Sequence, residues 1–350
     1  MFADFISPDD CCWARVLERV PHDVYHLPQY AVVTAKHEGG KPVAFYARAG
    51  QKEILIPLLL KALPAQLEAS GEWKDATSPY GYPGPVTTHP HDSRWLEESL
   101  SALQNLGSGH GIVTAFLRLH PLRGVTADTF AGHGIVVHHG PIVYVDLTRT
   151  LDELQAGTRL NHKRNIRRLA QAGFMTSVDD WSIYPAFGSL YRATMERVRA
   201  ADFYFFSDAY FEDLRRMLKE RLHFFAVVAP GGQLAAAGLF TETDGIVEYH
   251  LGGTATAYLR QAPSKLMFDA VIRWGKSIGA EVLNLGGGMG GRAGSLFEFK
   301  AGFSHSRAQF HTVRMILDEP LYADLAHGWR ARGGNVQAVE TFFPIYRMDL

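Results

Sequence analysis

The sequence has little cysteine and no recognisable pattern of metal ligands. Its two cysteines are the neighbours Cys11 and Cys12. A disulfide between adjacent residues is strained, and the pair lacks the usual spacing of metal ligands, so we expect two reduced, structural thiols. The 16 histidines are scattered, with no pair beside carboxylates on one helix face. The sequence therefore predicts no metal site.

An excess of charge of either sign is also missing. The chain carries 35 lysines and arginines against 36 aspartates and glutamates, a formal net charge of -1. Such a protein has no overall positive field to hold a long stretch of nucleic acid. We therefore expect no DNA partner, and only local contacts with any RNA.

Long apolar runs are missing as well. No run approaches the roughly 20 apolar residues that a helix needs to cross a bilayer. The first residues, MFADFISPDD, are acidic where a signal peptide is basic. We expect a cytoplasmic protein with no integral membrane segment. Since 47% of the residues are hydrophobic, the chain is expected to fold along its whole length. A monomer is the expected default state.

The sequence pattern of the first third of the chain predicts a hairpin, a rigid loop, a helix and a strand, in that order. Residues 42–50 and 52–63 are β-rich runs joined by a short glycine-containing turn, which predicts a hairpin. The segment SPYGYPGPV at 78–86 predicts a rigid turn that presents Tyr80 and Tyr82. The elements expected next are a helix at 93–106 and strands at 111–119 and 134–147.

A second unit is expected to begin near residue 148. Residues 159–173 predict a basic helix closed by Gly173. Strand-like runs joined by glycine-containing turns then predict an antiparallel meander, followed by a helix and one more strand. The meander runs lie at 223–230, 232–243 and 245–254, the helix at 264–279 and the last strand at 280–287.

This order of elements indicates the fold. An antiparallel meander that ends in a loop, a helix and one further strand is the core order of the acetyltransferase (GNAT) fold, and the first third shows a degraded version of it. We therefore expect an α/β (α+β) protein of two tandem GNAT-like lobes, each a mixed, mostly antiparallel sheet flanked by helices. The N-terminal lobe is placed at 1–147, with 323–350 packing back on it, and the C-terminal lobe at 148–322.

Residues 249–304 combine several motifs: YHLGGT, a helix that begins SKLMF, an LGG turn and FEFKAGF. This combination resembles the FemABX family of aminoacyl-tRNA-dependent transferases and their GNAT-like relatives. The loop at 79–85 and the basic helix at 161–173 are similar to segments of the same family. The resemblance extends from about residue 25 to residue 347.

The resemblance implies an aminoacyltransferase that forms an amide bond by moving an amino acid from aminoacyl-tRNA to an amine of a peptidoglycan precursor or peptide natural product. The acceptor end of aminoacyl-tRNA and the amine-bearing peptide are then the partners, and no further cofactor is expected. The chain lacks the long helical hairpin of larger members, so an acyl-CoA-dependent N-acyltransferase acting on a cell-envelope or natural-product amine stays open. A non-catalytic binding protein on the same fold is the third alternative.

Lys300, in FEFKAGF, is the predicted catalytic residue. Attack of an amine on an ester or thioester passes through a tetrahedral oxyanion, which a fixed cation stabilises by roughly 3 kcal/mol where water is excluded. Aromatic residues on both sides of the lysine, Phe299 and Phe303, favour this role over that of a surface lysine. The resemblance points to the same residue.

Two segments are predicted to contact phosphate. The helix at 159–173 lines up basic side chains, as a tRNA acceptor stem or a diphosphate requires, with a solvated helix face as an equal alternative. Residues 260–265 stand where acyl-CoA enzymes of the GNAT class hold a pyrophosphate, but Pro263 removes a donor and the usual glycine pair is missing. The candidates are Lys163, Arg164, Arg167, Arg168, Ser264 and Lys265.

A further set of residues is predicted to line the acceptor site. Aromatic rings beside an arginine can stack on a base or sugar and pair with a phosphate or carboxylate, and packing in the core is the plain alternative. The candidates are Lys36, Tyr80, Tyr82, Arg197, Tyr204, Tyr249, His250 and Phe299.

The sequence shows no nucleophile with an adjacent base, such as a GxSxG motif or a cysteine with a partner histidine. Direct attack by the acceptor amine is therefore predicted. Asp146, Glu248 and His250 are the candidate general bases. The glycine-rich run at 285–294 lacks the pattern of a phosphate loop, and predicts either a sharp bend beside a ligand or a flexible connection.

Overall fold

The computed structural model describes residues 1–67, 72–334 and 342–348. The chain forms two compact units, unit 1 at residues 1–139 and 310–350, and unit 2 at 140–309. The chain passes between them along β7 (Ile135–Asp146) and β13 (Arg307–Ile316). Both boundaries therefore fall within strands, whereas the sequence placed them after residues 147 and 322.

Unit 1 is built on a mixed sheet. Its strands lie in the order β1 (Phe2–Ile6), β2 (Lys41–Ala49), β3 (Lys52–Ala62), β4 (Lys74–Thr77), β6 (Ile112–Arg118) and β13, and β5 (Val86–Thr87) pairs with β3. Among the pairs that the structure describes in this unit, β4–β6 is parallel and the others are antiparallel. The predicted hairpin is β2 and β3, whereas β1 has no counterpart among the predicted elements.

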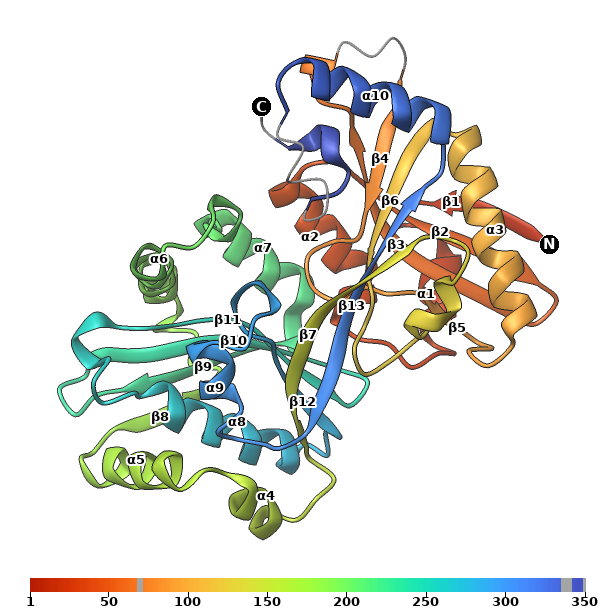
Figure 1. Cartoon of the computed structure of the whole chain (residues 1–350). Helices are drawn as coiled ribbons and strands as arrows, with labels where there is room; N and C mark the ends of the chain where they lie inside the picture. Colours follow the sequence, from red (N-terminus) through yellow and green to blue (C-terminus); the bar gives the residue numbers. More distant parts are fainter. Residues whose placement is uncertain (68–71, 335–341, 349–350) are drawn as a thin grey trace. The chain divides into compact units, whose positions relative to one another are not determined.

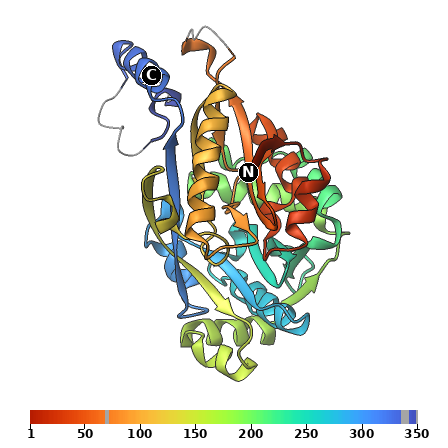
Figure 2. The ribbon, with the colours of Figure 1, turned by 90° about the vertical axis from the view of Figure 1, so that its right-hand side faces the viewer.

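Both faces of the β2–β3 hairpin are covered by helices. Phe45 and its alternate neighbours pack on the apolar stripe of α3 (Ser93–Gly109), which begins where Asp92 accepts from the Trp95 amide. Tyr46, on the opposite face, receives a hydrogen bond from Arg15 of α1. The other helices of this unit are α1 (Cys11–Leu17), α2 (Pro28–Glu38) and α10 (Glu319–Ala331). Figure 2 shows α3 along its length beside the strands of unit 1.

The C-terminal segment is tied to unit 1 through a buried carboxylate. Asp75 accepts from Thr114 Oγ1 at 2.7 Å, from the Tyr346 hydroxyl at 2.7 Å and from Arg347 Nε at 2.5 Å. Trp329 of α10 packs in the same apolar cluster as Tyr346. The segment expected to return to this lobe includes residues 335–341 and 349–350, which lie outside the described residues.

Unit 2 contains the predicted meander. Its strands lie in the order β7, β12 (Val282–Gly286), β11 (Ile246–Thr254), β10 (Leu234–Thr243), β9 (Leu222–Val228) and β8 (Met175–Val178). The meander β9–β10–β11 is antiparallel, and β11 then pairs with β12 in parallel after an intervening helix. The predicted order of meander, helix and strand is confirmed.

Helices lie on both faces of the sheet of unit 2. In Figure 1, α6 (Phe187–Val198) and α7 (Asp208–Leu218) lie on one face, and α5 (Leu160–Gln171) and α8 (Ser264–Ser277) on the other. The short helices α4 (Leu151–Gly157) and α9 (Ser295–Lys300) complete the unit. Apolar residues of α8, such as Met267 and Val271, join those of β9 to β12 in one core. No helix in the described part of the chain combines the length and the apolar character needed to span a membrane.

Candidate functional site

The site is built where the parallel strands β11 and β12 part. They pair only from Ile246 opposite Val282 to Glu248 opposite Asn284. Just beyond this point β11 carries a bulge, because Phe240 pairs with Tyr249 while Leu239 pairs with Leu251. A bulge redirects side chains and ends regular pairing, and such irregularities are common beside active sites.

Lys300 lies at the end of α9, and its side chain is buried with 7% exposed. Its Nζ donates to the Gly287 carbonyl at 2.8 Å and lies 5.6 Å from the centre of the Tyr249 ring. No ion pair to Lys300 occurs among the residues that the structure describes. The short helix α9 holds the ammonium of Lys300 inside unit 2.

Burial lowers the pKa of Lys300 to about 8, and the charge of Glu248 opposes that shift. Removal from water disfavours the charged form of an amine, which is why burial dominates. Since the pKa stays above 7, the side chain is mostly an ammonium at neutral pH. Burial also raises the pKa of Tyr249 to about 12, so the phenol beside the ammonium is neutral.

Phe299 precedes Lys300, is partly buried and packs against the core of unit 2. Its ring contacts those of His162, Phe268 and Phe303 at centroid distances of 5.6, 5.7 and 5.6 Å. Phe303 is buried with 2% exposed. These rings fix the end of α9, and the role of Phe299 in contacting substrate stays a prediction.

The candidate bases have different surroundings. Glu248 is buried and accepts from Asn284 Nδ2 at 2.9 Å. The Asp146 carboxylate accepts from the amide and the hydroxyl of Thr148, so it is used in a local turn. His250, at the bulge, has Nε2 3.1 Å from the Tyr210 hydroxyl. Of the three, only Glu248 is electrostatically coupled to Lys300.

The basic helix α5 packs along α8. Asn165 Nδ2 donates to the Gln261 carbonyl, in the loop before α8, at 2.9 Å. Burial lowers the pKa of Lys265, and the nearby charge of Arg168 lowers it further. Two cations held this close would be relieved by a bound anion. The other predicted phosphate ligands are Lys163, which donates to the Gln155 carbonyl, the exposed Arg164 and Arg167, and Ser264, whose Oγ is 2.9 Å from Thr254 Oγ1.

The first turn of α8 already uses several of its backbone donors. The amides of Lys265 and Leu266 donate to the carbonyls of Ala262 and Pro263 at 3.1 and 3.0 Å. The amide of Gln261, in the loop before it, donates to the Tyr258 carbonyl at 3.0 Å. A diphosphate at a helix N-terminus is held by backbone N–H groups that lack an internal partner. At these positions the N–H groups that would form such a cradle already donate to carbonyls within the chain.

The predicted acceptor residues divide between the units. Lys36, Tyr80 and Tyr82 lie in unit 1. Lys36 is exposed on the last turn of α2, the Tyr80 amide donates to Glu38 Oε1 at 2.7 Å, and the Tyr82 ring contacts Phe310 at 5.1 Å. Gly81, between the tyrosines, has a φ of 99°, and a Cβ there would meet the Tyr25 ring at 2.3 Å. The loop is therefore as constrained as its sequence predicts.

The other two residues predicted for this site, Arg197 and Tyr204, lie in unit 2. Arg197 donates to Thr256 Oγ1 at 3.2 Å and to Thr194 Oγ1 at 3.3 Å. The Tyr204 carbonyl accepts from the Tyr191 hydroxyl, and its side chain is partly exposed. The residues that the structure brings together around Lys300 are thus Tyr249 and Glu248, with Asn284 and Gly287, which the sequence did not single out.

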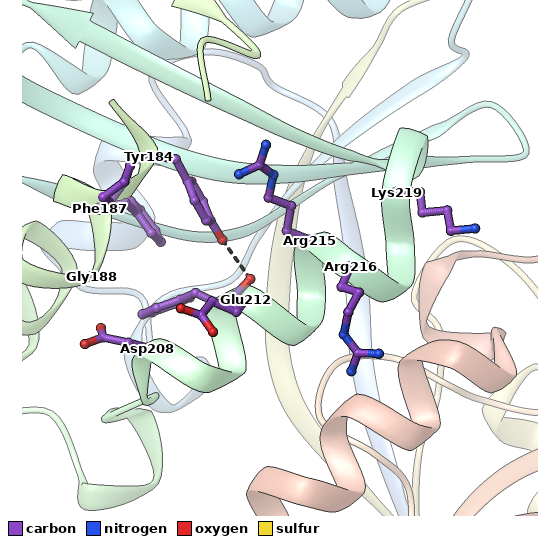
Figure 3. Close-up of a pocket in the computed structure, with 10 residues that line it drawn as sticks. Tyr184, Phe187, Gly188, Asp208, Glu212, Arg215, Arg216 and Lys219 are labelled. Atoms are coloured by element: carbon purple, nitrogen blue, oxygen red, sulfur yellow. Dashed lines mark hydrogen bonds between the residues drawn. The ribbon is translucent and has the colours of Figure 1, made fainter. Parts of the chain in front are cut away.

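A cavity of about 700 Å³ opens between α7 and the segment that leads into α6 (Figure 3). Its floor is aromatic, and the Tyr184 hydroxyl donates to the Phe211 carbonyl at 2.9 Å. Acidic side chains border the first turns of α7 and basic ones the last turns, the order that the helix dipole favours. The lining residues are Tyr184, Pro185, Phe187, Gly188, Asp208, Phe211, Glu212, Arg215, Arg216 and Lys219, and none was predicted as a site residue.

Asp10, Cys11 and Cys12 bring a carboxylate oxygen and two sulfurs within 4.8 Å of one another. Asp10, however, caps α1 by accepting from the Cys12 amide, and Arg15 donates to Cys12 Sγ at 3.3 Å. Burial also raises the pKa of the Cys12 thiol, which disfavours the thiolate that metals bind. The group is best explained as a helix start.

Known proteins share the fold around this site. Residues 156–300 match a family model described as an acetyltransferase (GNAT) domain. The solved structure of FemX is similar over 92% of this chain and 99% of its own, with a TM-score of 0.70 at 14% identity. L-PGS from Bacillus licheniformis is similar over 88% and 92%, with a TM-score of 0.55 at 13% identity. No curated protein matches the chain by sequence. The chain has a FemX-like GNAT fold, and the predicted fold class is confirmed.

Proposed function

We propose that this FemX-like GNAT protein is an acyltransferase that takes an amino acid from aminoacyl-tRNA and delivers it to an amine of a peptidoglycan precursor or peptide natural product. The observation that carries the proposal is the buried ammonium of Lys300, held by the Gly287 carbonyl where β11 and β12 part. A buried cation without a carboxylate contact lowers stability, which favours a functional role over a structural one.

The proposed reaction balances without a cofactor. The acceptor nitrogen attacks the carbonyl carbon of the aminoacyl ester, so that a C–N bond forms while the carbonyl oxygen takes up negative charge. The C–O bond to the tRNA ribose then breaks. The nitrogen loses one proton and the ribose oxygen gains one, so the protons balance. An ammonium has three donors and Lys300 uses one on Gly287, which leaves donors for the transient oxyanion.

The start of α8 supports a tRNA donor over acyl-CoA. The amides of Lys265 and Leu266 donate within the chain, so they do not form the backbone cradle that a CoA pyrophosphate uses. The exposed Arg164, Arg167 and Arg168 on α5 instead offer side-chain contacts that suit a phosphate backbone.

An acyl-CoA-dependent N-acyltransferase is the second candidate. The match of residues 156–300 to an acetyltransferase domain favours it. So does the Arg168 and Lys265 pair beside α8, since two cations can bind a diphosphate without backbone donors.

Incubation of the chain with total charged tRNA and a pool of UDP-linked peptidoglycan precursors and free peptides tests the donor. We expect an acceptor whose mass, measured by mass spectrometry, increases by one amino acid residue, and loss of that product after RNase treatment. Lys300→Met should abolish the product. A product that survives RNase but requires acetyl-CoA would establish the second candidate, and saturable binding of acetyl-CoA in calorimetry would support it.

A further inference from the structure

Asn284 links the buried carboxylate of Glu248 to the glycine turn that holds Lys300. Its side chain is completely buried, with 0% exposed. Its Nδ2 donates to Glu248 Oε1 at 2.9 Å, and its Oδ1 accepts from the Gly286 amide at 2.8 Å. The next carbonyl, that of Gly287, accepts from Lys300 Nζ at 2.8 Å. These hydrogen bonds, joined by the backbone of Gly286 and Gly287, link Glu248 near the start of β11 to Lys300 in α9.

The backbone determines which way the Asn284 amide points. The Gly286 N–H is a donor, so the atom of Asn284 that faces it is the oxygen. The amide nitrogen therefore faces the carboxylate of Glu248, which accepts. An aspartate at this position would keep the acceptor for Gly286 but set two carboxylates against each other.

The bond to Gly286 secures an unusual backbone conformation. Gly286 has a φ of 72°, a region that residues with a side chain rarely adopt. The register between β12 and β7 also shifts between Asn284 and Gly286. The bend ends the strand and turns the chain toward α9, and the Gly287 carbonyl that follows meets the Lys300 ammonium.

We propose that Asn284 is a positioning residue for Lys300, acting through the turn at Gly286 and Gly287, and that Glu248 is the counter-charge to which this turn is coupled. Buried networks in which every member is bonded select one arrangement of their side chains. The catalytic consequence rests on the proposed function, whereas the coupling of Glu248 to Lys300 does not.

An exchange of donor and acceptor tests the link. Asn284→Asp alone should lower kcat about 100-fold, the cost of a small misplacement of a catalytic group. In the double variant Glu248→Gln with Asn284→Asp, the new carboxylate at 284 accepts both from the Gly286 amide and from the new amide at 248. The double variant should regain at least about tenfold of the lost rate, since the two positions are in contact. Absence of any recovery would overturn the assigned network.

A second readout needs no substrate. The resonance of Lys300 in protein with ¹³C-labelled lysine side chains, assigned by its loss in Lys300→Arg, should titrate near the pKa of about 8. Glu248→Gln should lower that midpoint, and the double variant should move it back toward the wild-type value. Asn165→Asp, which removes a comparable donor from α5, should leave it unchanged.

The two readouts separate the proposals. A midpoint that does not respond to Glu248→Gln contradicts the coupling, whatever the activity shows. A midpoint that responds as expected, in a protein that transfers no amino acid from tRNA, leaves the coupling in place and contradicts the proposed function.

Discussion

Asp75 in unit 1 and Lys300 in unit 2 are both charged and buried, with 3% and 7% of the residue exposed, but their surroundings differ. Asp75 accepts hydrogen bonds from Thr114, Tyr346 and the guanidinium of Arg347. Lys300 donates to one neutral carbonyl. A fully bonded buried charge with an oppositely charged partner fixes architecture, whereas a buried cation on a neutral partner keeps its charge available.

The largest effect should come from removing the cation of unit 2. Lys300→Met should lower the rate of amide formation about 1,000-fold, the cost of losing a donor to a developing oxyanion. Lys276→Met is a matched control, because Lys276 also donates its Nζ to a backbone carbonyl, that of Leu147 at 3.1 Å. Equal loss of activity in both variants would contradict a special role for Lys300.

Removing the charge of unit 1 should act on folding alone. Asp75→Asn leaves the partly buried Arg347 without its carboxylate, and should lower the free energy of unfolding of unit 1 by about 3 kcal/mol. Chemical denaturation followed by fluorescence measures the change. The folded fraction should keep the wild-type kcat, and a reduced kcat in fully folded protein would break the distinction between the two regions.

The same comparison predicts a gain of stability where the site is destroyed. The pKa of Lys300 is about 8 in the folded chain against an ordinary value of 10.5 for lysine, so burial of its charge costs about 3 kcal/mol below pH 8. Lys300→Met should therefore raise the free energy of unfolding at pH 7, and this gain should fade as the pH rises from 8 to 10.5. Denaturation curves at pH 7 and pH 10 measure this gain. If Lys300→Met is less stable than the wild type at pH 7, Lys300 has a structural role instead.

The smallest effect should come from the exposed basic face of α5. Arg168→Ala should weaken binding of charged tRNA about threefold and reduce the salt dependence of binding by about one contact, since phosphate contacts are individually weak. Removing that charge should also raise the pKa of Lys265. Filter binding at several salt concentrations measures the first effect. An unchanged salt slope would show that α5 is only a solvated face.

The elements of both units differ in how well the sequence predicts them. The meander of unit 2 and α8 are strongly patterned, because apolar residues repeat with the periods of strand and helix. The edge strand β8 is mostly exposed and short, so its sequence, MTSV, carries no such pattern. The hairpin of unit 1 was predictable from two β-rich runs and a turn, while β1, at the chain start, was not.

The candidate site was predictable only in part. Lys300 could be singled out by the motif around it, but its burial depends on α9 and on the carbonyl of Gly287. Asn284 lies inside the predicted strand at 280–287, and nothing in its sequence neighbours indicates a carboxylate partner. Its partner Glu248 is 36 positions away, and only the register between β11 and β12 brings the two together.

If the charge of Lys300 carries the reaction, the alkaline limb of the pH–rate profile must report its loss. The wild-type kcat should fall above pH 8, about tenfold per unit, as the ammonium loses its proton. Lys300→Arg keeps a cation at all these pH values, so whatever its absolute rate its profile should stay level to pH 10. The same downward limb in both proteins would show that another group titrates and would contradict the account.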